Sequence, residues 1–106
     1  MKPANFAPTY LALYPQLAEI ARKHGYAMAV HGSVGRDFDL ICIPWVDEPD
    51  EPDAVIDEIV STFVIRRHPG GWEDKKHGRR AHTICIFGEW AIDLSFMPSL
   101  PANNKI

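Results

Sequence analysis

The residues of this sequence best suited to chemistry are two aspartates that follow a short glycine-containing turn, Asp37 and Asp39. In an extended strand, side chains two positions apart leave the same face, so the Cβ atoms of these two residues would lie about 6 to 7 Å apart. Like charges held this close repel one another, and a hard divalent cation relieves the repulsion. Mg²⁺ is commonly held by one or two carboxylates together with substrate phosphates. The same residues also fit an ordinary hairpin turn, because Asp is common beside Gly in turns.

A third carboxylate, Asp93, stands in the apolar run from Trp90 to Met97, between Ile92 and Leu94. Burying an unpaired charge in such a strand is costly, so something must compensate it. The sequence therefore predicts three carboxylates on two strands, with a cation as the compensating partner.

In chain order, Gly32-Ser33, then Asp37 and Asp39, then Asp93 resemble the pattern of the DNA polymerase beta-like nucleotidyltransferase superfamily. That pattern is a strand, Gly-Ser, an Asp-x-Asp on the next strand, and a later Asp between apolar residues on an adjacent strand. The resemblance covers residues 26 to 97. It implies that the strand of Asp93 lies beside the strand of Asp37 and Asp39.

The resemblance also implies a reaction, the transfer of a nucleoside monophosphate from a nucleoside triphosphate to an acceptor. Asp37 and Asp39 would hold Mg²⁺ or Mn²⁺ against the triphosphate. Asp93 would help a second ion to lower the pKa of the attacking hydroxyl. These three aspartates are the expected catalytic and metal-binding residues.

Five further residues are expected to bind the nucleotide: Gly32, Ser33, Arg36, Arg79 and Arg80. Gly32 can adopt backbone angles that point amides at an anion, and the resemblance implies that Ser33 donates a hydrogen bond to a phosphate. The three arginines can bind phosphate oxygens bidentately. Arg79 and Arg80 equally fit ordinary surface positions. Three residues separate Ser33 from Asp37, fewer than the helical turn found in most of the family.

Other candidate chemistry is not expected. His31 fits a strand-end histidine bonded to the turn better than a metal ligand. Zinc is not expected, because the histidines and cysteines lack the paired spacing of structural zinc sites. The two cysteines, Cys42 and Cys85, each lie in an apolar run and are expected to be free.

Length and composition indicate one small domain spanning residues 1–106. The formal net charge is -3, with acidic residues gathered between Asp47 and Glu58 and basic residues between Arg66 and His82. No run has the length of a membrane span or a signal peptide, so we expect a cytoplasmic protein without a membrane partner.

Periodicity predicts the elements that position these residues. We expect helices over 15–24 and across the apolar stripe that begins at Val55, and strands over 26–31, 37–43, 79–87 and 90–97. Residues 72–78 show no period and are expected to be an irregular segment. The predicted fold is α/β (α+β), a small mixed sheet of about four strands with helices packed on one side.

Three functions are compatible with this sequence. The first is a metal-dependent nucleotidyltransferase, whose unknown acceptor is a partner protein or a nucleic acid. The second is a catalytically degenerate module of the same fold that acts by binding metal, nucleotide or a partner. The third is a nucleic-acid accessory protein that uses the basic segment, which the acidic net charge disfavours.

Overall fold

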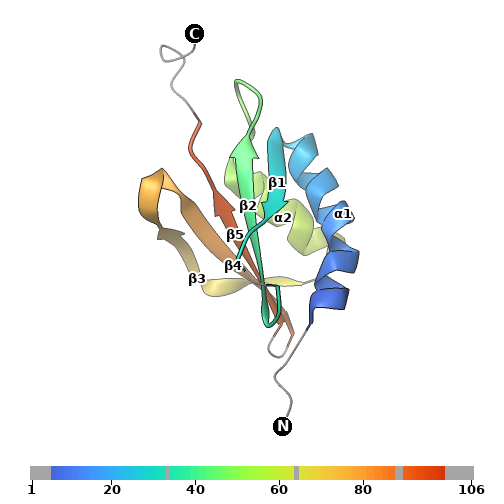
Figure 1. Ribbon diagram of the computed structural model, residues 1–106. Helices are drawn as coiled ribbons and strands as arrows, with labels where there is room; N and C mark the ends of the chain where they lie inside the picture. The colour runs from blue at the N-terminus through green and yellow to red at the C-terminus, as the bar shows by residue number, and fades with distance from the viewer. Residues whose placement is uncertain (1–5, 33, 64, 88–89, 100–106) are drawn as a thin grey trace.

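The computed structural model describes residues 6–32, 34–63, 65–87 and 90–99, which form a mixed α/β fold (Figure 1). The helices and strands follow in the order α1 (Ala7–Lys23), β1 (Tyr26–Val30), β2 (Asp37–Pro44), α2 (Pro52–Phe63), β3 (Arg66–Asp74), the 3₁₀ helix η1 (Lys76–Gly78), β4 (Arg80–Phe87) and β5 (Trp90–Phe96). The mixed α/β prediction is confirmed, but the sheet has five strands rather than about four. Among the described residues, no helix has the length and apolarity needed to cross a membrane.

The sheet has the strand order β1-β2-β5-β4-β3. β2 and β5 are parallel, and every other neighbouring pair is antiparallel. The implied adjacency of the Asp93 strand and the Asp37–Asp39 strand is therefore confirmed. A short apolar run such as residues 26–31 is typical of a central strand, but β1 lies at the edge of the sheet. Its exposed residues, Ala27, Ala29 and Val30, are apolar as well.

The additional strand is β3, and its last residues, Trp72 to Asp74, lie in the segment that was predicted to be irregular. It pairs with β4 on both sides of an irregularity between Arg67 and Trp72. This irregularity takes up Pro69, which is tolerated because β3 is an edge strand. Contacts with other elements keep the strand in place: Arg67 forms ion pairs with two aspartates of α2, and the Trp72 ring packs against His82 and Phe96.

Helix α1 begins at Ala7, earlier than the predicted start at residue 15, and Pro15 lies inside it. Pro15 is exposed, so water can reach the carbonyl that its missing N–H leaves without a helical partner. Gly25 follows the helix with a φ of +92°, the left-handed conformation expected there. Burial of Tyr10, well before Pro15, explains why the first turns stay helical.

The core lies between the two helices and one face of the sheet. Alternate residues of β2 and β5 point into it, and the fully or nearly fully buried ones are Phe38, Leu40, Cys42, Ile92, Leu94 and Phe96. In Figure 1, α2 lies behind the sheet and α1 runs beside β1, which leaves the other face without a helix. Cys42 and Cys85 are free, as predicted.

Tyr10 connects α1 to the strands that carry the aspartates. Its ring stacks on Phe38 with 5.0 Å between centroids. Its hydroxyl accepts a hydrogen bond from the Ala91 N–H at 3.1 Å and donates one to the Arg36 carbonyl at 2.5 Å. Because Arg36 precedes β2 and Ala91 is the second residue of β5, this one side chain fixes the starts of both strands.

The second tertiary link joins the end of α1 to α2 through His24. Its Nδ1 lies 2.8 Å from Asp50 Oδ2, and its Nε2 lies 2.8 Å from Glu58 Oε1. Burial acts to lower the pKa of His24, but the hydrogen bonds and charges of Asp50 and Glu58 outweigh it and raise the pKa. The imidazolium, which donates from both nitrogens, is thus the form that this site favours.

We predict that His24 stabilises the fold mainly in its protonated form. The pKa of His24 is higher in the folded state than in the unfolded state, where it is about 6.5. Its contribution to the free energy of unfolding is therefore complete below about pH 6.5 and is lost as pH rises through the folded pKa. His24→Gln should therefore lower the free energy of unfolding more at about pH 6 than at about pH 9. Urea denaturation at both pH values measures this, with His68→Gln as the exposed control. An equal loss at both values would contradict the prediction.

Candidate functional site

The face of the sheet without helices carries the predicted carboxylates. Strand alternation sends Phe38 and Leu40 into the core, so Asp37 and Asp39 point to the opposite face. On β5 the same alternation buries Ile92 and Leu94 and turns Asp93 outward. We call this surface the open face.

Four side chains form a line across the open face, and we call this line the carboxylate row: His31, Asp39, Asp93 and Thr83. Asp39 is the register partner of Asp93, and Asp93 is the register partner of Thr83. The backbone N–H of His31 donates a hydrogen bond to the backbone carbonyl of Asp39 at 3.0 Å. This bond continues the pairing of β1 with β2 by one residue beyond Val30. Since neighbouring strands lie about 4.8 Å apart, Asp39 has an imidazole on one side and a carboxylate on the other.

Asp37 lies one step away from the carboxylate row, in register with Ala91. Its side chain is exposed, whereas those of Asp39 and Asp93 are half-buried. The structure therefore brings all three predicted carboxylates onto one face of two adjacent strands. Within the described residues, no three His, Cys, Asp or Glu side chains gather closely enough to form a ready metal-binding cluster.

The pKa of Asp39 is shifted by burial and by the carboxylates that lie near it. Burial raises the pKa of Asp39, the charges of Asp93 and Asp37 raise it further, and His31 acts in the opposite direction. A divalent cation would offset the repulsion between these carboxylates, and their oxygens are the ligands that Mg²⁺ and Mn²⁺ accept. The residues present thus fit such an ion in charge and donor type.

Gly32 brings the loop backbone against Asp39. Its φ is +68°, and a Cβ at this position would lie 3.0 Å from Asp39 Oδ2. Both observations explain why the turn needs glycine here, since a side chain would strain the backbone and crowd the carboxylate. The next predicted residue, Ser33, lies outside the described residues.

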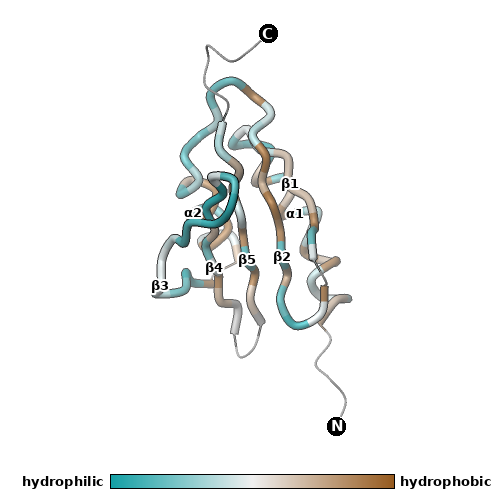
Figure 2. Tube along the Cα trace, turned by 60° about the vertical axis from the view of Figure 1, so that its left-hand side comes forward, coloured by the Kyte–Doolittle hydropathy of each residue, from teal (hydrophilic) through white to brown (hydrophobic). Residues whose placement is uncertain are grey.

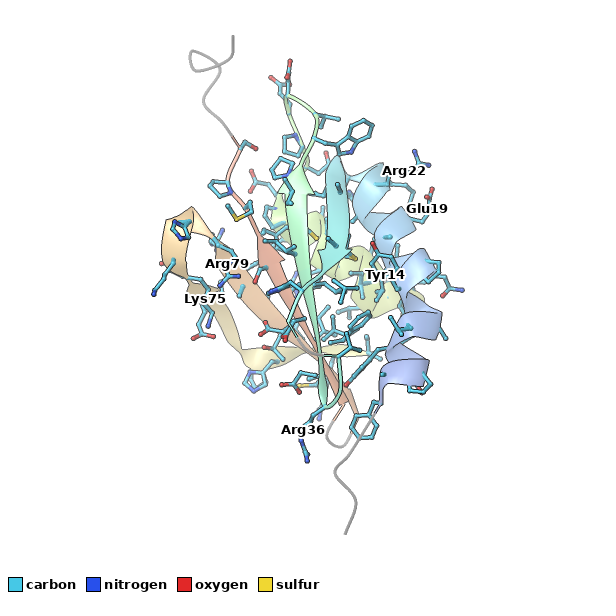
Figure 3. All side chains as sticks on the ribbon, in the orientation of Figure 1. Tyr14, Glu19, Arg22, Arg36, Lys75 and Arg79 are labelled. Atoms are coloured by element: carbon cyan, nitrogen blue, oxygen red, sulfur yellow. The ribbon has the colours of Figure 1, made fainter. Side chains whose placement is uncertain are left out.

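The three predicted arginines do not meet at the aspartates. Arg36 lies in the β1–β2 loop, and its side chain points away from the body of the sheet (Figure 3). Arg80 lies over the Trp72 ring, 4.6 Å from its centroid, among side chains on the helix side of the sheet. Arg79 directly precedes β4 and has an extended backbone. Because side chains alternate along a strand, the side chain of Arg79 leaves the same face of the sheet as that of Thr83. Its Nε is enclosed and has no hydrogen-bond partner in the described part of the chain.

Two further residues of this face could not be identified from the sequence. Thr83 joins the carboxylate row, and Ser95, which is 4% exposed, lies two positions beyond Asp93. Only the pairing of β4 with β5 brings Thr83 beside Asp93, and no local signal specifies that register. His31 was visible in the sequence, but its position opposite Asp39 depends on the pairing of β1 with β2.

The chain was compared with protein-family models, with curated proteins and with solved structures, and none of the three comparisons finds a match. The chemistry of the open face must therefore be inferred from its own side chains. Those are two half-buried carboxylates in register, an exposed third carboxylate and a flanking imidazole.

We predict that Asp39→Asn raises the thermal stability of the protein without divalent ions. The raised pKa means that the folded state binds more protons than the unfolded state as pH falls, so ionised Asp39 destabilises the fold at neutral pH. The variant should melt a few degrees higher at neutral pH, and the gain should shrink as pH falls through the folded pKa. Thermal melts in a chelator measure this, with Asp74→Asn on the exposed strand β3 as the control. A lower melting temperature for Asp39→Asn would contradict the repulsion.

Proposed function

We propose that this protein is a metal-dependent nucleotidyltransferase that moves a nucleoside monophosphate from a nucleoside triphosphate to an acceptor. One observation supports this most directly. Asp39 and Asp93 are register partners on parallel strands of the open face, with Asp37 two residues before Asp39. The order of these residues along the chain resembles that of the DNA polymerase beta-like superfamily.

The carboxylates would bind the ions and so hold the triphosphate. Asp39 and Asp93, which lie side by side, would hold the ions together with Asp37, whose side chain is exposed. When bound, divalent ions stabilise the entering and leaving oxygens and lower the pKa of the attacking hydroxyl. The acceptor hydroxyl would lose its proton to water as its oxygen bonds to the α-phosphorus. The bond from that phosphorus to the oxygen that bridges the α- and β-phosphates would break, and pyrophosphate would leave.

Two parts of the chain would assist the phosphates. The backbone at Gly32 lies against the Asp39 carboxylate, so a triphosphate held there would meet the loop amides. Arg79, which precedes β4 and lies on the side of Thr83, would bind phosphate oxygens that the ions leave uncovered. The aspartates and this loop are thus the proposed machinery.

The second candidate function is a module of the same kind that binds metal or nucleotide without transferring it. Two observations favour it: three residues separate Ser33 from Asp37, and the described residues hold no ready three-ligand metal cluster. Such a module would bind a nucleoside triphosphate but release no pyrophosphate. Binding and turnover must therefore be measured separately.

We predict that Mg²⁺ or Mn²⁺ with a nucleoside triphosphate raises the melting temperature, because a ligand at a hundredfold excess over its Kd adds about 2.7 kcal/mol. Asp93→Asn should abolish the shift, whereas Asp74→Asn should retain it. Labelled triphosphate, incubated with and without cell extract as a source of acceptor, should release pyrophosphate and label an acceptor. A melting shift without pyrophosphate would identify the binding module, and the absence of both would refute the proposed function.

Arg79 and Arg80 form a matched pair of neighbours on opposite sides of the sheet. We predict that Arg79→Ala weakens the binding of a metal–triphosphate complex and that Arg80→Ala does not, because Arg80 lies over Trp72. Calorimetric titration at fixed Mg²⁺ measures both variants. If both leave triphosphate affinity unchanged but reduce the salt dependence of single-stranded nucleic-acid binding, the basic segment serves a nucleic acid instead.

A further inference from the structure

Beyond the carboxylate row, the part of the open face formed by β1 and β2 becomes apolar. The next register line across β1 and β2 pairs Ala29 with Ile41, and the line after it pairs Ala27 with Ile43. Met97 continues β5 on the same side, since its N–H donates to the Cys42 carbonyl at 2.9 Å. We call these residues, Ala27, Ala29, Ile41, Ile43 and Met97, the apolar strip. Figure 2 shows β2 changing from hydrophilic near its start to hydrophobic further along.

The apolar strip ends in a hollow of about 480 Å³ between the ends of β2 and β5. Its walls are Ile43, Pro44, Trp45, Val46, Asp47, Met97, Pro98 and Ser99. Three of these side chains are large, apolar and open to solvent: Ile43 is 45% exposed, Trp45 62% and Val46 40%. Large exposed apolar side chains gathered around one hollow are typical of a binding surface.

We propose that the apolar strip and its hollow bind the nucleoside half of the nucleoside triphosphate, with the base against Ile43 and Trp45. This inference rests on the proposed function and names the place of its substrate. The triphosphate lies at the carboxylate row, and the ribose and base extend along β2 toward its carboxyl end.

The distribution of charge along β2 supports this occupant. The carboxylate end requires a ligand with metal ions, whereas Ile41 and Ile43 offer no charge and suit an uncharged, flat group. A metal–nucleotide complex has these two halves joined by one sugar. Each step of two residues along a strand covers about 6.7 Å, so Ile41 lies one step and Ile43 two steps from Asp39.

The size and chemistry of the hollow also fit a nucleoside. Small-molecule sites commonly have volumes of about 300 to 1,000 Å³ and are mostly apolar with few polar groups. Here the polar groups at the wall are the Asp47 carboxylate and the Ser99 hydroxyl. An exposed tryptophan offers a face on which a base stacks, and such stacking contributes about 1 to 3 kcal/mol per base.

Two probes separate the base from the phosphates. Calorimetry at fixed Mg²⁺ compares ATP, GTP, CTP and UTP with tripolyphosphate, which lacks a nucleoside. The double variant Ile43→Thr with Trp45→Ala should lose about tenfold in affinity for the nucleotides it binds, and its affinity for tripolyphosphate should not change. The matched control is Val30→Thr with Leu11→Ala, since both residues are exposed and apolar but lie off the open face. This control should bind both probes as the unmodified protein does.

The outcomes distinguish this inference from the proposed function. If the unmodified protein binds tripolyphosphate and nucleotides equally, or if the double variant keeps full nucleotide affinity, the nucleoside lies elsewhere while the metal–phosphate site stands. If neither probe binds, the proposed function and this inference both fail. If the double variant changes the sedimentation of the protein but not nucleotide affinity, the apolar strip joins copies of this chain, and the inference is refuted.

Discussion

The parallel register of β2 and β5 is the constraint on which the rest of this structure depends. It sets Asp39 beside Asp93, an arrangement that raises the pKa of Asp39 through burial and neighbouring charge and therefore opposes folding at neutral pH. The opposing stabilisation comes from the other face of the same two strands, where their alternate residues are buried against both helices. Tyr10 adds a direct link, because its hydroxyl binds the backbone ahead of β2 and at the start of β5. The fold thus holds together two carboxylates that repel each other.

Because both helices lie on one side, the two faces of the sheet have different surroundings. Substitutions on the helix side, such as at Leu40, act on packing and cost stability. Substitutions on the open side, such as at Asp93 or Ile43, would leave this packing in place. The contacts of His24 join the two helices, and the ion pairs of Arg67 join β3 to α2. These contacts support the fold without using side chains of the open face.

Much of this arrangement was predictable from local patterns, and the failures have physical causes. The apolar stripe of α2 and the alternation in β2 specify their elements, and the resemblance based on the order of the three aspartates implied that β2 and β5 are neighbours. Burial of Tyr10 keeps α1 helical ahead of Pro15. The packing of Trp72 keeps residues 72–74, which show no periodicity in the sequence, in strand β3. The register of β4 decides that Thr83 meets Asp93. Long-range pairing also puts the side chain of Arg80 over Trp72, away from the aspartates.

The arrangement of cations gives the strongest reason to expect a metal-loaded ligand at the open face. In the described part of the chain, two basic side chains beside the sheet are engaged on its helix side: Arg67 pairs with aspartates of α2, and Arg80 lies over an indole ring. His31 alone is seen to act on Asp39 with the opposite sign to its acidic neighbours. An anionic ligand without metal ions would add to the repulsion at Asp39 and Asp93, and a simple cation would leave the apolar strip unused. A complex of divalent ions with a ligand that is anionic at one end and uncharged at the other satisfies both halves of the face.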